Sequence, residues 1–115
     1  TGIKSLDVTI DCDNLDAKEL GKMGIPARFD LCNIEGFEDT DGKMHPAEDV
    51  REAISDLGFP IDDAVKDKPS IRLKIDKMFT GLLAGFPGNN NFILTVTENN
   101  GLSTTKTLKY YVPVN

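Results

Sequence analysis

The sequence predicts a mainly β fold, an antiparallel β-sandwich with short helices inserted in its connections. Near the carboxyl end, two runs alternate between apolar and polar side chains with the period of a half-buried strand. Their apolar members are Phe92, Leu94, Val96, Leu102, Leu108, Tyr110 and Val112. Asn100-Gly101 separates the runs, a dipeptide typical of β-hairpin turns. A two-stranded ribbon cannot bury its apolar row by itself, so the hairpin requires a facing layer from the rest of the chain.

The amino-terminal third predicts a strand, a helix and a second strand. Residues 3–12 alternate between apolar and polar side chains, as a strand does. Residues 17–23 form a short helical run after Asp13-Asn14-Leu15-Asp16, which offers N-cap residues, and Gly24 is placed to end it. Residues 28–32 predict a short second strand.

The middle of the chain predicts a loop followed by a helix. Residues 33–45 are polar and rich in turn formers, which indicates a surface loop. Pro46 suits the first position of a helix, and acidic residues follow in its first turn. One helical face then collects the apolar residues Val50, Ala53, Ile54 and Leu57.

The segment that leads to the hairpin predicts a connection, a strand and a helical turn. Residues 59–69 read as a crossing connection, and residues 70–76 alternate as a strand. The period then changes to a helical one at Met78, Phe79, Leu82, Leu83 and Phe86. Residues 87–90 are expected to reverse the chain into the hairpin.

Size and charge exclude several classes of partner. The 115 residues suit one domain, which we expect to be one module of a longer protein. The formal net charge of −6 disfavours nucleic acid as a partner. No run of 18 apolar residues occurs, so we expect no membrane insertion by this segment. The two cysteines, Cys12 and Cys32, leave both a disulfide and separate thiols open.

The order of features resembles the immunoglobulin-like (Ig-like) modules of Bacteroidetes surface lipoproteins, several of them families of unknown function. The similar features are a Leu-x-Val-x-Ile strand, Phe29-Asp30-Leu31, Leu57-Gly58-Phe59-Pro60, an Ile-x-Leu-x-Ile strand with a Leu-Leu turn, and the hairpin. The likeness spans nearly the whole chain, but only Leu94-Thr95-Val96-Thr97 through Gly101 to Lys106-Thr107-Leu108 is specific. Where an Asp commonly precedes the turn in those modules, Glu98 and Asn99 stand here.

The resemblance implies an Ig-like sandwich and a non-catalytic role as spacer, adhesive unit or accessory domain. It also implies an extracytoplasmic location, at the cell surface or in the periplasm, through a lipoprotein anchor outside this segment. The implied partners are neighbouring domains of the same chain and a glycan or protein ligand. The resemblance carries over no catalytic residue, and we expect no cofactor.

Three features remain as candidates for binding chemistry. Asp39 and Asp41 lie in an acidic, Gly-containing loop of the kind that binds Ca²⁺, although a solvated turn explains these residues more simply. His45 is the only histidine and cannot build a typical zinc site alone, so we expect it to flank the start of a helix. Tyr111 has the outward parity of the last strand and could stack on a sugar ring, with Tyr110 in the core. A carbohydrate-binding module, with or without calcium, is therefore the alternative function.

Overall fold

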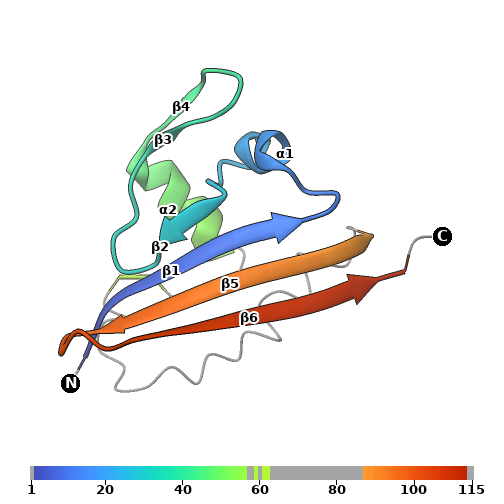
Figure 1. Ribbon diagram of the computed structural model, residues 1–115. Coiled ribbons are helices and arrows are strands. Elements are labelled where there is room, and N and C mark those ends of the chain that lie inside the picture. Colours follow the sequence, from blue (N-terminus) through green and yellow to red (C-terminus); the bar gives the residue numbers. More distant parts are fainter. Residues whose placement is uncertain (1, 57–58, 60, 63–86, 114–115) are drawn as a thin grey trace.

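The computed structural model describes residues 2–56, 59, 61–62 and 87–113, and its centre is a four-stranded antiparallel sheet (Figure 1). The strand order is β2-β1-β5-β6. The strands are β1 (Ile3–Cys12), β2 (Arg28–Asp30), β5 (Gly88–Glu98) and β6 (Ser103–Val112). The mainly β class with short inserted helices is confirmed, and the strand over residues 3–12 has the predicted bounds. An Ig-like topology stays a prediction.

The carboxyl-terminal hairpin is the longest paired unit of this sheet. β5 and β6 pair from Thr97 opposite Ser103 to Gly88 opposite Val112. Gly101 closes the turn with a φ of 90°, a left-handed conformation that favours glycine, and its N–H donates to the carbonyl of Glu98 at 2.9 Å. The sequence signal for a hairpin at this place is therefore confirmed.

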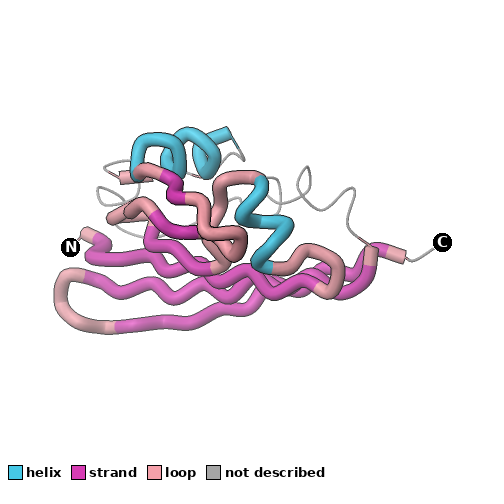
Figure 2. The backbone as a smooth tube through the Cα atoms, turned by 90° about the horizontal axis from the view of Figure 1, so that it is seen from above, coloured by secondary structure: helices cyan, strands magenta, loops and turns pink. Residues whose placement is uncertain are grey.

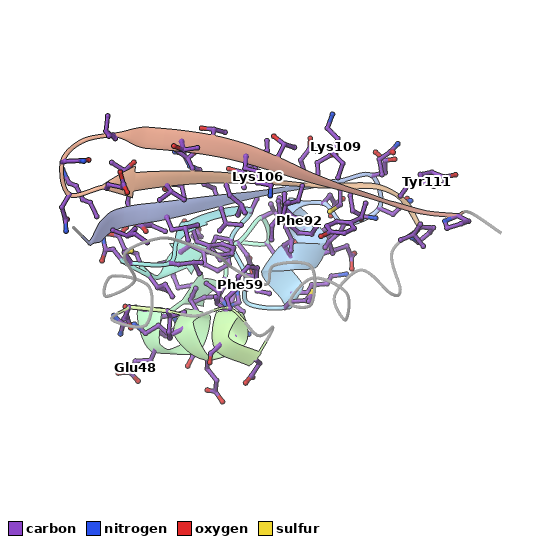
Figure 3. The ribbon with its side chains drawn as sticks, turned by 90° about the horizontal axis from the view of Figure 1, so that it is seen from below. Glu48, Phe59, Phe92, Lys106, Lys109 and Tyr111 are labelled. Carbon is purple, nitrogen blue, oxygen red and sulfur yellow. The ribbon has the colours of Figure 1, made fainter. Side chains whose placement is uncertain are left out.

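One face of the sheet is buried, and the side chains of the other face are half-buried or exposed. Phe92 is fully buried and Leu94 is 4% exposed, while Val96 is half-buried. Figure 2 shows α1 (Ala17–Lys22) and α2 (Ala47–Asp56) on the same side of the sheet. The core between sheet and helices contains Ile3, Leu6, Val8, Ile10, Leu15, Leu20, Ile25, Phe29, Leu31, Cys32, Ile34, Val50, Ile54, Phe59, Phe92 and Leu94. Figure 3 shows Phe59 and Phe92 in the space between the sheet and α2.

Both predicted helices within the described residues are confirmed. The carboxylate of Asp16 caps α1 by accepting from the backbone N–H of Glu19 at 2.9 Å. α2 starts directly after Pro46 and buries Val50 and Ile54, as its periodicity predicts.

Several local expectations were wrong. Residues 33–45 contain a two-stranded sheet, β3 (Phe37–Glu38) and β4 (Met44–His45), rather than only a loop. Residues 87–90 do not form a turn, because β5 already begins at Gly88. Leu102 is 64% exposed because it lies in the turn region, where its N–H donates to the side chain of Asn100 instead of continuing the strand alternation.

Three further expectations concern the cysteines, residues 70–86 and membrane insertion. Cys12 and Cys32 form no disulfide with each other. The expected strand over residues 70–76 and the helical turn near residues 78–86 lie outside the described residues. In the part of the chain that is described, no helix has the length and apolar character needed to cross a membrane.

Candidate ligand-binding groove

A groove of about 410 Å³ lies beside β2, at one edge of the four-stranded sheet. Asp7 of β1 and all three residues of β2 line it, and the segment from Asn33 to Phe37 forms its other wall. A volume of this size is within the range of small-molecule sites, about 300–1,000 Å³. The groove therefore joins three parts of the chain that are separate in the sequence.

The side chain of Asp30 determines how the chain leaves β2 and builds the groove wall. Its Oδ1 accepts from the backbone N–H of Leu6 at 3.0 Å and from that of Cys32 at 2.9 Å. The N–H of Asn33 then donates to the carbonyl of Asp30 at 3.0 Å. These bonds end the strand earlier than the predicted residue 32 and turn the chain into the wall segment.

Two aromatic rings give the groove its apolar part. Phe29 is 7% exposed and packs edge-to-face on Phe59, with ring centroids 5.8 Å apart. Phe37 is half-buried and stacks on the imidazole of His45, with centroids 4.8 Å apart and planes inclined by 14°. The stacking orients the Phe37 ring, which leaves a fixed apolar surface in the wall.

Charged side chains surround this apolar part. Arg28 is exposed and Asp7 is half-buried, and neither side chain forms a hydrogen bond or ion pair with a residue that the structure describes. Glu35 accepts a long hydrogen bond of 3.5 Å from the side chain of Asn33. The lining contains three carboxylates and one guanidinium, which gives the groove a net negative formal charge.

The arrangement suits a ligand with both an apolar face and many hydroxyl groups. Carboxylate and guanidinium groups form charge-assisted hydrogen bonds, and each can contact two neighbouring hydroxyls at once. An aromatic ring can pack against the C–H face of a sugar, since the ring face carries negative charge.

The predicted calcium candidates lie elsewhere, in the turn between β3 and β4. Asp39 Oδ1 accepts from the N–H of Asp41 and from the N–H of Lys43, both at 2.9 Å. Its Oδ2 lies 2.8 Å from His45 Nε2, which carries the proton in this bond because an ionised carboxylate can only accept. The bond from His45 is the main cause that lowers the pKa of the Asp39 carboxyl, and the backbone donors add to it.

The same contacts explain why the turn has this structure. A Cβ added at Gly21 of α1 would come within 2.8 Å of the Cβ of Asp39, so the helix backbone packs directly on this turn. His45 is buried and does precede α2, as predicted, but its contacts with Asp39 and Phe37 were missed. The described residues contain no group of three or more His, Cys, Asp or Glu placed to hold a metal, and the calcium site at Asp39 and Asp41 stays a prediction.

Tyr111 lies far from the groove within the sheet. Tyr111 is 66% exposed on β6, opposite Asn89 of β5, whereas the groove lies beside β2 at the other edge of the sheet (Figure 3). Its outward direction agrees with its parity. Tyr110 is half-buried and packs edge-to-face on Phe92, with ring centroids 6.5 Å apart.

A second, shallower groove of about 360 Å³ lies between the end of α1 and α2. Its apolar residues are Met23, Ile25 and Ala53, and its rim carries Asp49, Glu52 and Asp56 of α2. Its charged residues are all acidic, and no aromatic ring lines it. It therefore has fewer ways to orient a ligand than the groove beside β2.

Sequence reasoning did not identify the groove residues as a site. Asp7 and Arg28 are outward-facing strand residues, and Phe37 was placed in a polar loop. The local sequence signal was limited to Arg28 and Asp30 on either side of Phe29 in the predicted strand over residues 28–32. Comparison of the chain with protein-family models, with curated proteins and with solved structures finds no match.

Proposed function

We propose that this chain is a non-catalytic module that binds carbohydrate in the groove beside β2. The observation that carries the proposal is that Arg28 and Asp7, which have no partner among the described residues, flank an apolar wall that contains the ring of Phe37. A charged side chain without a protein partner can form a hydrogen bond to a ligand without breaking a hydrogen bond inside the protein. The resemblance to surface lipoprotein modules adds the extracytoplasmic location to this proposal.

The charge of the groove narrows the class of glycan. Asp7, Asp30 and Glu35 contribute three carboxylates against the single guanidinium of Arg28. A uronic acid or sulfated sugar would meet net repulsion there, and the chain as a whole carries a net charge of −6. Neutral glycans and glycans with free amino groups are therefore the expected ligands.

The test is a glycan array that contains neutral, amino and acidic glycans, followed by titration of the best ligand. Arg28→Gln should weaken binding about tenfold or more, because a charge-assisted hydrogen bond contributes roughly 1.5–3 kcal/mol. Lys106→Gln is the matched control, since it removes one exposed cation from β6, at the other edge of the sheet.

The other outcomes each contradict a stated part of the proposal. Binding lost with Tyr111→Ala and kept with Arg28→Gln would move the site to β6. No binding across the array would instead favour the expected spacer module, and release of sugar from a glycan would contradict a non-catalytic role.

A further inference from the structure

Among the residues that the structure describes, the outer edge of β6 is an open edge of the sheet. β6 pairs with β5 on one side, and no residue that the structure describes pairs with its other side. The N–H of Glu98 donates to the carbonyl of Leu102, and hydrogen-bonded pairs recur at every second residue of an antiparallel ladder. The even-numbered residues of β6 therefore bond to β5, and the N–H and C=O groups of residues 103, 105, 107, 109 and 111 point outward.

This edge is long and exposed. The side chains of residues 103–107, 109 and 111 are exposed, and Leu102 and Tyr111 are 64% and 66% exposed. Such a row of backbone donors and acceptors is a template for a further strand. Lys106 and Lys109 are the only charged residues of β6, so the strand has a formal charge of +2 within a chain of −6.

We propose that β6 pairs with β6 of a second copy of this chain, antiparallel and around a two-fold axis at Thr107. This arrangement aligns every outward-pointing residue from 103 to 111 with an outward-pointing residue of the partner copy, which permits about ten backbone hydrogen bonds. An interface of this kind is closed, because each copy offers the same surface to the other. The result is one continuous sheet that joins the sheets of both copies.

The positions of the lysines favour this register over its neighbours. With the axis at Thr107, Lys109 faces Thr105 of the second copy and Lys106 faces Leu108, so no like charges are directly opposite. An axis at Lys106 or at Lys109 would place that lysine against itself, which is destabilising. An axis at Leu108 also avoids this contact but shortens the ladder, because residue 103 loses its partner.

The side chains of the proposed interface are also compatible across the axis. Leu102 faces Val112, and Ser103 faces Tyr111, so the two exposed apolar residues at the ends of the strand both gain contacts. Contact through a single strand edge buries less area than the roughly 1,200–2,000 Å² of a standard interface. We therefore expect a reversible dimer with a Kd between about 1 µM and 1 mM.

The first experiment measures mass against concentration by analytical ultracentrifugation for the unaltered chain, Thr107→Pro and Thr107→Val. Proline removes an outward N–H that bonds nowhere within the described fold, so it should abolish the dimer and leave the melting temperature nearly unchanged. Valine keeps the N–H and should keep the dimer. A chain that is monomeric up to millimolar concentration, or a dimer that withstands Thr107→Pro, overturns the proposal.

A second set of variants tests the register. Thr105→Glu places a carboxylate opposite Lys109 of the second copy, twice by symmetry, and should strengthen the dimer several-fold. Thr105→Lys should weaken it by a similar factor. Thr105→Gln is the neutral control, since all three changes remove the 3.1 Å contact between the hydroxyls of Thr105 and Thr95. Equal effects of the glutamate and lysine variants would overturn this register.

Discussion

The two edge strands of the four-stranded sheet differ in length and in what lies against them. β2 has three residues, and the bonds around Asp30 turn the chain so that the segment from Asn33 to Phe37 lies against it. β6 has ten residues, and its outer edge meets no described residue. Natural sheets protect their edges with short strands, covering loops or charges, and β2 uses the first two devices.

The difference shows that one sheet can provide two kinds of surface. At β2 the covering segment leaves a concave space with fixed side chains, which suits a small ligand. At β6 no described residue pairs with the outer backbone groups, and such an edge suits another strand. The two proposals place ligand binding and self-association at opposite edges, so variants at one edge should leave the other property unchanged.

The largest expected difference between the edges is in their packing. Phe29→Ala removes a buried ring that contacts Phe59 and should lower the free energy of unfolding by about 3–5 kcal/mol. Leu108→Ala, at a half-buried position of β6, should lower it by only about 1–2 kcal/mol. Urea denaturation measures both. Equal losses would show that the two edges are equally well packed, and Leu102→Ala should change stability by less than about 0.5 kcal/mol.

A smaller effect should come from the carboxylate that ends β2. Asp30→Ala leaves the N–H groups of Leu6 and Cys32 without their acceptor and should cost about 1–3 kcal/mol. Asp30→Asn keeps a carbonyl oxygen at this position and should cost less. If the two variants melt alike, the hydrogen bonds are not what ends the strand, and the protection of the β2 edge has another origin.

Part of this comparison was predictable from the sequence because it depends on local patterns. The alternation over residues 3–12 predicted the bounds of β1. N-cap residues predicted α1, and Pro46 with an apolar helical face predicted α2. The hairpin followed from two alternating runs around Asn100-Gly101. Each of these signals comes from residues that are close together in the sequence, where backbone geometry and burial act together.

The features that the sequence did not predict depend on contacts between residues that are far apart in the chain. Leu6 pairs with Val96 and Val8 with Phe29, and no periodicity specifies which strands become neighbours or edges. The two-residue strands of the β3–β4 hairpin are too short for any alternation to show. The groove was missed for the same reason, since Asp7 and Phe37 line one groove only once β2 has paired with β1.

The smallest expected effect concerns the β3–β4 hairpin, which continues from the segment that covers β2. The pKa of Asp39 is lowered in the folded chain by the bond from His45, so its ionised form stabilises the fold above the unfolded pKa. This stabilisation should be lost as the pH falls from about 4 through the lowered pKa of the folded state. The melting temperature of the wild-type chain should therefore fall more steeply below pH 4 than that of Asp39→Asn, which has no carboxyl to titrate at this position.

Asp41→Asn is the matched control. The Asp41 side chain is exposed, and its carboxylate accepts no hydrogen bond from the described residues, so this variant should keep the wild-type slope. Parallel curves for all three proteins would show that the Asp39–His45 contact does not stabilise the hairpin, which would leave the stacking of Phe37 on His45 and the bonds around Asp30 to hold the segment that covers β2.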